Sequence, residues 1–469
     1  MANKKLNLIF FGIDTLRKNR MSLYGYDRLT TPHIEKYLSD GAVFDNCFSP
    51  SIPTTSGYSS MMTGMDIFST DVVALRHQGD MAPGIKTLAE ILGENGYNTS
   101  CVGFSGNVGG RGYQKYIDFD GWFADRGDGR AHKAENLNDA AIPELERLAG
   151  EDRPFFLFLR HMDPHAPYLP PYPYNRIFYQ DNEFDPSNKS LKSCYEFKPF
   201  RDFFLSWFPA GCTDAEYIGA QYDGAIAYMD ACIAQILKKI AALGLEEETL
   251  VIFTSDHGET LTEHGCYFDH HSLYDPTLIV PLAFKLKNSP VISKKRFSDI
   301  CQLKDIVPTV LDIMQINTDI KFDGRNLMNL IRGGETGQEA EMYVTEATWM
   351  RKHGWRTPEW KLINALEPDF HYFPKVELYN LISDPKENDN IADKDPETVK
   401  YLTDRMNAFI KKREKETGRT NPMITNAGKW NGFGKAFESS DEAYNSLHIG
   451  DPAEAQKLQA KLAELGVEI

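Results

Sequence analysis

Short apolar runs alternate along this chain with longer stretches of helical periodicity, and this alternation limits the possible folds more than any other feature. Residues 6–13 (LNLIFFGI), 154–161 (PFFLFLRH) and 249–255 (TLVIFTS) are nearly continuous apolar runs. Such runs are typical of strands that are buried on both faces. Residues 213–243, between the last two runs, carry apolar side chains at helical spacing. The pattern predicts an α/β fold with a doubly wound, mostly parallel sheet flanked by helices.

The chain of 469 residues is longer than a single core usually becomes, so we expect a large domain and a smaller one. We assign residues 1–339 to a catalytic α/β domain. Within it, residues 168–209 are rich in Pro, Tyr and Phe and are expected to form an insertion, or lid, over one face. Residues 340–420 predict a C-terminal α+β subdomain, and residues 421–469 a tail that ends in a helix.

Charge and cysteine content limit the possible partners and the compartment. The formal net charge of −16 repels polyanions, so we expect no nucleic-acid partner. No apolar run reaches eighteen residues, so we expect no membrane span. The seven cysteines are odd in number and widely spread, which favours reduced, buried thiols and a cytoplasmic protein.

Candidate metal ligands follow two of the predicted strands directly. Asp14 follows the first run, and Asp256 and His257 follow the run at 249–255. Ligands of open α/β sheets bind beyond the carboxyl ends of the strands, so these side chains should meet at one edge. Each alone could simply cap the next helix. Together they favour a divalent cation site.

A third candidate is the hydroxyl-rich segment 51–64 (SIPTTSGYSSMMTG). A hydroxyl at a helix start lies beside unpaired backbone N–H groups and the positive end of the helix dipole, which stabilise an alkoxide or a bound oxyanion. Taken alone, the segment is more typical of helix capping and turns than of a catalytic group.

A series of short motifs extends along residues 6–415. The motifs are residues 14–17 (DTLR), 24–26 (YGY), 31–34 (TPHI), 44–46 (FDN), 62–64 (MTG), 163–168 (DPHAPY), 255–259 (SDHGE), 263–265 (EHG), 274–275 (YD), 280–281 (VP), 377–381 (ELYNL) and 384–385 (DP). In content and order they resemble the sulfatases of the alkaline phosphatase superfamily. The resemblance implies a metal-dependent ester hydrolase.

The nucleophile motif departs from the family pattern. Sulfatases carry Cys-x-Pro-x-Arg, or a serine version, starting ten residues before the closing glycine, and its first residue becomes formylglycine. That register places Thr54 at the nucleophile and Tyr58 at the arginine. Ser51 begins a similar Ser-x-Pro three residues too early, and formylglycine there is the alternative. A threonine nucleophile resembles phosphonate monoester hydrolases and phosphodiesterases, and also transferases that are generally membrane-tethered.

The resemblance also implies a set of site residues. The implied metal ligands are Asp14, Thr54, Asp256 and His257. This mixed oxygen and nitrogen set suits one Mn²⁺ or Zn²⁺ ion better than Ca²⁺. The expected catalytic residues are Thr54, His165, His270 and Arg17, although Arg17 could equally form an ion pair under the sheet. The expected substrate-binding residues are Asn107, Tyr58 and His271, and His270 with His271 could instead hold a second metal.

We therefore predict a hydrolase that cleaves a phosphodiester or phosphonate monoester, a small anionic substrate, through Thr54. The first alternative is a true sulfatase acting on an aryl or carbohydrate sulfate. The second is a non-catalytic binding protein, which the joint presence of Asp14, Thr54, Asp256 and His257 disfavours. A tail beyond the family's usual end suggests a homo-oligomer.

The acidic charge generates the first test. Random-sequence duplex DNA and single-stranded RNA should not bind appreciably at physiological salt, because the net field opposes the phosphates. Fluorescence anisotropy of labelled oligonucleotides measures this, and tight, salt-sensitive binding would contradict it.

Overall fold

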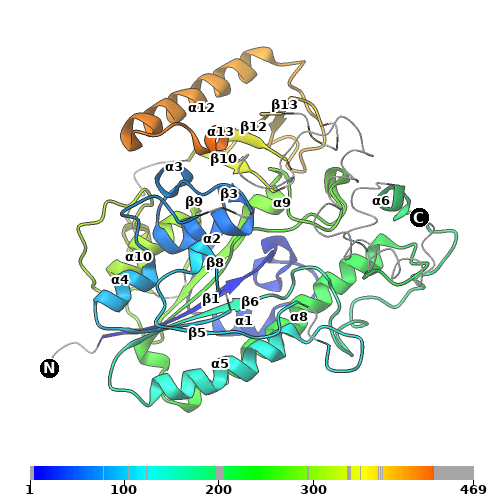
Figure 1. Cartoon of the computed structure of the whole chain (residues 1–469). Coiled ribbons are helices and arrows are strands. Elements are labelled where there is room, and N and C mark those ends of the chain that lie inside the picture. The colour runs from blue at the N-terminus through cyan, green and yellow to red at the C-terminus, as the bar shows by residue number, and fades with distance from the viewer. Residues whose placement is uncertain are drawn as a thin grey trace.

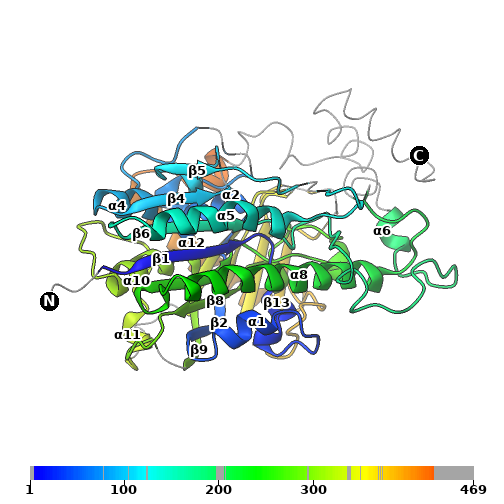
Figure 2. The same ribbon diagram turned by 90° about the horizontal axis from the view of Figure 1, so that it is seen from below.

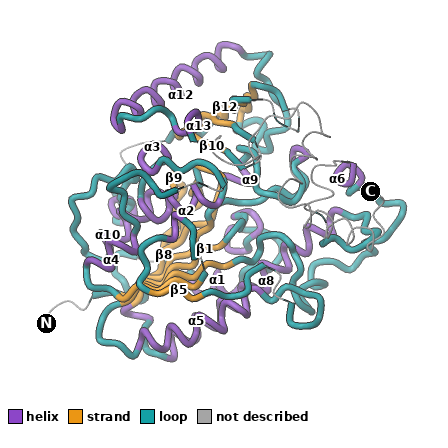
Figure 3. Tube along the Cα trace, viewed as in Figure 1, coloured by secondary structure: helices purple, strands orange, loops and turns teal. Residues whose placement is uncertain are grey.

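The protein is described here by a computed structural model that covers residues 5–75, 77, 79–103, 105–122, 125–196, 205, 207–292, 295–334, 340–348, 350–367, 369, 371 and 373–426. Its centre is an eight-stranded sheet (Figure 1, Figure 3). The strands, in spatial order, are β5 (Lys115–Ile117), β4 (Asn98–Val102), β6 (Phe155–His161), β1 (Asn7–Ile13), β7 (Thr249–Ser255), β8 (Ile279–Lys285), β2 (Ala42–Phe48) and β9 (Lys295–Gln302). Only the two pairings of β8 are antiparallel, so the predicted mostly parallel sheet is confirmed.

Helices cover both faces of this sheet (Figure 1, Figure 2). One core contains Ile9 and Phe11 of β1 and the buried faces of α1 (Pro32–Tyr37), α5 (Lys133–Ala149) and α8 (Ala215–Ala242). The other contains Leu8 and Phe10 of the same strand, with α2 (Thr54–Thr63), α4 (Leu88–Glu94) and α10 (Ile306–Ile313). Successive side chains of a strand point to opposite faces, so one continuous apolar run supplies both cores.

Local signals set both ends of the seven-residue helix α4. Thr87 accepts a hydrogen bond from the Glu90 backbone N–H, and the Glu90 carboxylate accepts one from the Thr87 N–H. This capping box fixes the first turn at Leu88. Gly96, with φ +86°, follows the other end and turns the chain toward β4.

A second sheet forms the predicted C-terminal α+β subdomain. Its strands, in spatial order, are β13 (Val376–Asn380), β12 (Trp360–Ala365), β11 (Lys352–Arg356), β10 (Met342–Glu346) and β3 (Ser51–Ile52). Helix α12 (Pro396–Thr417) packs on this sheet (Figure 1) through Leu402 and Met406. The short strand β3 comes from the chain just before α2 and pairs with β10 in parallel. The second sheet is thus attached directly to the segment that leads into α2.

The remaining elements are short. They are η1 (Lys18–Arg20), η2 (Ser22–Tyr24), α3 (Ile67–Thr70), η3 (Val108–Gly110), α6 (Lys192–Glu196), η4 (Glu246–Glu248), η5 (Glu263–Gly265), α9 (Asp275–Leu278), η6 (Leu303–Asp305), α11 (Met328–Ile331) and α13 (Pro422–Thr425). Of the predicted tail at 421–469, residues 427–469, with the expected final helix, lie outside the described residues. Within the described parts of the chain, no helix has the length and apolarity needed to span a bilayer. All seven cysteines are buried free thiols.

The aromatic pair between β1 and β7 provides a stability test. The rings of Phe11 and Phe253 stack with centroids 4.6 Å apart, and Phe253 is 2% exposed. Phe253→Ala should lower the free energy of unfolding by about 3–5 kcal/mol, because the cavity lies between packed layers. Phe184→Ala, at a side chain that is 46% exposed, is the control. Denaturant unfolding that gave the two variants similar losses would contradict this packing.

Candidate functional site

Parallel pairing of β1 and β7 brings the predicted metal ligands together. Ile13 lies opposite Ser255 in the register of these strands, so Asp14 and Asp256 leave the sheet side by side. Asp14, Asp256 and His257 are fully buried, and one donor atom from each lies within 4.8 Å of the others. The sequence predicted two carboxylates and one imidazole at this edge of the sheet, and the three side chains lie there.

The two carboxylates are electrostatically unequal. Burial would raise the pKa of Asp14, but the Arg160 guanidinium, His165 and His257 together lower it below its ordinary value. Burial and the neighbouring Asp14 raise the pKa of Asp256 to about 7. Asp14 Oδ1 and Asp256 Oδ2 are buried without a hydrogen-bond partner. A divalent cation would satisfy both oxygens and replace the proton that Asp256 otherwise holds, so the donor set fits a metal.

Thr54 is the first residue of α2 and points toward this group. Its Oγ1 lies 3.0 Å from His257 Nε2. The Nδ1 atom of the same ring faces the Gly258 carbonyl at 2.9 Å. A carbonyl only accepts, so Nδ1 carries the proton and Nε2 keeps its lone pair for the Thr54 hydroxyl or a metal.

Gly57 permits the close approach of α2 to the end of β7. A Cβ atom at this position would lie 2.8 Å from the Asp256 carbonyl oxygen, closer than carbon and oxygen normally approach. The small residue within the Ser/Thr segment is therefore required for the helix N-terminus to reach the metal-ligand group. Its position, three residues after Thr54, fixes the distance between hydroxyl and carboxylates.

A cleft of about 1640 Å³ opens over this group. Of the residues expected from the sequence, Thr54, Asn107, His165 and His270 line it. The His165 and His270 rings lie 5.3 Å apart, and His270 stacks on His257 at 4.6 Å. Burial lowers the pKa of His165 to about 4 and that of His270 well below its ordinary value. The two imidazoles are thus neutral in the empty cleft at neutral pH.

Three expected site residues lie elsewhere. Arg17 is buried, and its Nη1 donates to Glu263 Oε1 at 2.7 Å. This ion pair is the arrangement expected for Arg17 as the alternative to a catalytic role. Tyr58, in the second turn of α2, is fully buried and packs into the core on that face of the sheet. His271 turns away from His270, and its Nε2 faces His371 Nε2. Their substrate roles stay predictions, and none of the three lines the cleft.

Sequence reasoning missed Arg160, the cation at the floor of the cleft. Its Nη2 donates to Asp14 Oδ2 at 2.6 Å, and its guanidinium lies over the Tyr58 ring at 5.7 Å. Burial opposes its charge, but Asp14 and other neighbours raise its pKa above the ordinary value. The available signal was an arginine near the end of the strand β6, after five apolar residues, because a largely buried charge requires a local partner.

A second polar group adjoins the first. Glu259, Asp269 and His270 are buried with donor atoms within 4.8 Å of one another. His270 Nδ1 lies 3.1 Å from Asp269 Oδ1 and 3.9 Å from Glu259 Oε1. Burial and Asp269 raise the pKa of Glu259 well above its ordinary value. Neither carboxylate was assigned to the site from the sequence: Glu259 closes the motif at 255–259 but was given no role, and Asp269 occurs in a polar loop without distinctive spacing.

The metal-ligand group generates a direct test. Asp256→Asn should remove most of one equivalent of bound divalent metal, because the amide carries no charge to offset the cation. Asp118→Asn, an acidic residue that lines the cleft outside the group, should leave metal content unchanged. Plasma mass spectrometry of the purified proteins measures both. Equal metal content in Asp256→Asn and wild type would refute the assignment.

Known proteins that resemble this chain include sulfatases and a phosphonate monoester hydrolase. Bovine (Bos taurus) arylsulfatase K is 28% identical over 308 residues, covering 58% of this chain and 54% of its own length. N-acetylglucosamine-6-O-sulfatase of Bacteroides thetaiotaomicron is 22% identical over 479 residues, covering 83% of each chain. The structure of phosphonate monoester hydrolase from Agrobacterium radiobacter superposes with a TM-score of 0.70 and 19% identity, covering 87% of this chain and 96% of its own.

Two family models match the chain. The model for the C-terminal part of N-sulphoglucosamine sulphohydrolase matches residues 262–416, a range that includes the second sheet. The sulfatase model matches residues 7–316, the strands and loops that carry Asp14, Thr54, Asp256 and His257. The resemblance drawn from the motifs is therefore confirmed, and the chain belongs to the sulfatase family of hydrolases.

Proposed function

We propose that this protein hydrolyses a phosphodiester or phosphonate monoester with Thr54 as the nucleophile and one bound Mn²⁺ or Zn²⁺ ion. The observation that carries the proposal is the Thr54 hydroxyl. It lies at the N-terminus of α2, lines the cleft, and is 3.0 Å from His257 Nε2 within the group of metal ligands. The seven free thiols support a reducing, cytoplasmic setting.

A divalent cation held by Asp14, Asp256, His257 and Thr54 would supply positive charge that favours the Thr54 alkoxide and polarises a non-bridging substrate oxygen. Thr54 Oγ1 then forms a bond to phosphorus as the bond to the leaving oxygen breaks. The first unpaired N–H groups of α2 and the Arg160 guanidinium bind the phosphoryl oxygens, where negative charge accumulates. Water afterwards cleaves the phosphothreonine and restores the hydroxyl.

The leaving alkoxide needs a proton, and His165 and His270 are the neighbouring donors in the cleft. Burial keeps the pKa values of both low when the cleft is empty. An anionic ester beside them favours the imidazolium form. Substrate binding therefore raises their pKa values and the fraction of each ring that carries a proton to donate. The proposed acid is therefore charged only in the substrate complex.

The residues that line the cleft favour an ester with an aromatic or otherwise flat substituent. Its aromatic lining residues are Tyr116, Phe119, Trp122, Trp207, Phe208 and Phe268. Trp207 and Phe208 belong to the predicted insertion at 168–209, which supports a role for that segment in holding the leaving group. Asn107, at the start of η3, could donate its side-chain N–H to the ester.

Sulfate esters are the second candidate, because arylsulfatase K and N-acetylglucosamine-6-O-sulfatase are among the relatives. Oxidation to formylglycine requires cysteine or serine, and Thr54 is neither. Ser51 lies within β3, where its Oγ is 3.0 Å from Thr345 Oγ1 in the second sheet. This position supports Thr54, rather than Ser51, as the attacking residue.

The test is a panel of 4-nitrophenyl substrates: a phosphodiester, a phosphonate monoester, a phosphate monoester and a sulfate, each with Mn²⁺ and Zn²⁺. We expect the first two to be turned over fastest. Thr54→Ala should reduce kcat by several orders of magnitude, because only binding and electrostatic effects remain. Intact mass should match unmodified threonine and serine.

Thr55→Ala and Ser51→Ala are the matched controls, since both remove a neighbouring hydroxyl and should cost far less. Dominant sulfate turnover that requires Ser51, with an aldehyde in the intact mass, would overturn the proposal. Full metal occupancy without turnover of any substrate would favour the binding-protein alternative.

A further inference from the structure

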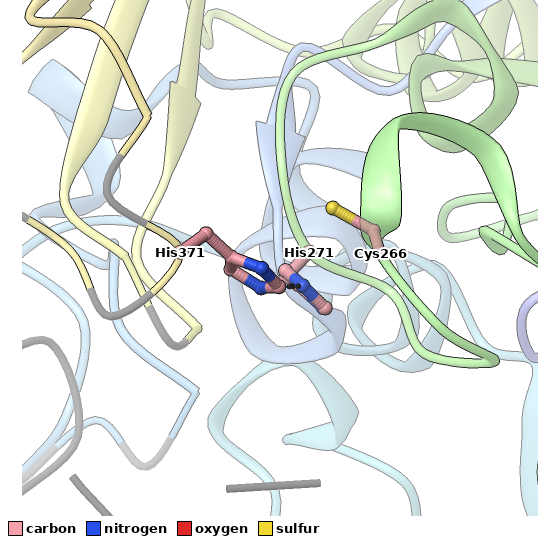
Figure 4. A group of neighbouring side chains, drawn as sticks. All are labelled: Cys266, His271 and His371. Carbon is pink, nitrogen blue, oxygen red and sulfur yellow. Dashed lines mark hydrogen bonds between the residues drawn. The ribbon is translucent and has the colours of Figure 1, made fainter. Parts of the chain in front are cut away.

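A third group of side chains that could hold a metal lies outside the cleft, where a loop of the catalytic domain meets a loop of the second sheet (Figure 4). Cys266 follows η5, and His271 precedes α9, both in the catalytic domain. His371 belongs to the loop between β12 and β13 of the second sheet. Cys266 and His271 are fully buried, and His371 is partly buried. No step of the proposed hydrolysis uses any of the three.

The donor atoms of this group converge. The two Nε2 atoms of His271 and His371 face each other at 2.8 Å, and their rings lie nearly parallel at 21° (Figure 4). The Cys266 Sγ completes a set whose donor atoms all lie within 4.8 Å. Tetrahedral zinc separates two ligand nitrogens by about 3.3 Å and sulfur from nitrogen by about 3.5 Å. Shifts of a fraction of an ångström to about 1 Å would therefore accommodate the ion.

Charges of both signs surround the group. The Lys352 ammonium pairs with Asp369 at 3.3 Å and with Glu377 at 3.2 Å, and Glu346 adds a third carboxylate near the Cys266 thiol. Burial raises the pKa of this thiol well above its ordinary value, so zinc has to displace a firmly held proton.

We propose that Cys266, His271 and His371 bind a Zn²⁺ ion at a second site, separate from the site of Asp14, Asp256 and His257. One thiolate and two imidazoles are a donor set typical of zinc, and a fourth donor such as water completes the tetrahedron. Binding displaces the Cys266 thiol proton to solvent and replaces the hydrogen bond between the two histidines. The ion joins the catalytic domain to the second sheet.

The site would also position catalytic groups. His271 immediately follows His270, and its Nδ1 lies 3.8 Å from Asp269 Oδ2. A carboxylate beside the second nitrogen of a zinc-bound imidazole orients the ring and increases its basicity. Because Asp269 also contacts His270 in the cleft, the zinc would hold the segment 266–271 in place. Cys266, His271 and His371 would act as positioning residues and would not contact the substrate.

The test uses the full chain in an Asp256→Asn background, which isolates the second site from the first. This variant should retain about one equivalent of zinc after removal of loosely bound metal. Adding His371→Ala or Cys266→Ser to this variant should abolish the remaining zinc binding. Adding His353→Gln should not, because this buried histidine bonds to the Tyr343 hydroxyl at 2.8 Å and lies outside the group.

Cobalt(II) provides a readout that a merely structural role would not produce. Cobalt-loaded Asp256→Asn protein should show a thiolate-to-cobalt charge-transfer band, which Cys266→Ser removes while the far-ultraviolet circular dichroism is unchanged. Equal zinc content with and without His371, or cobalt spectra without a thiolate band, would overturn the proposal. Complete absence of zinc from Asp256→Asn, rather than loss of the one equivalent assigned to the first site, would also count against it. None of these results depends on which ester the cleft hydrolyses.

Discussion

The pairing of β1 with β7 is the interaction on which the site depends. Parallel register places Asp14 and Asp256 side by side within a fully buried edge. Burial of Asp256, together with repulsion by Asp14, raises its pKa to about 7. Arg160 compensates Asp14 from the strand on the other side of β1. A bound dication would compensate both carboxylates. The strand register thus concentrates negative charge at the position where a metal would bind.

The backbone around this edge is held in an uncommon conformation. Thr15, a β-branched residue, has φ +57°, in the left-handed region that such residues rarely adopt. Its N–H donates to Asp256 Oδ1 at 3.2 Å, and its carbonyl accepts from the Tyr222 hydroxyl at 2.7 Å. These contacts from β7 and α8 maintain the strained residue beside Asp14. The site is thus organised by elements that are far apart in the sequence.

The sequence predicted the sheet, the C-terminal subdomain and the grouping of Asp14, Thr54, Asp256 and His257, because these follow from strand ends and motif register. It did not predict Arg160, whose role depends on which strand lies beside β1. Nor did it predict that neighbouring histidines separate, His270 into the cleft and His271 toward His371. Loop residues carry no periodicity that reveals their direction, and the dispersed cysteines gave no metal-ligand spacing.

The strand β3 couples the position of Thr54 to the second sheet. Its two residues hydrogen-bond to β10 in the second sheet and directly precede Pro53 and Thr54. A hinge motion between the two sheets would therefore be transmitted through β3 to Thr54, the proposed nucleophile. Exchanging the C-terminal subdomain between homologues would have to preserve this strand pairing to keep Thr54 in place. The predicted boundary at residue 340 divides the chain, but β3 links the N-terminal part to the second sheet.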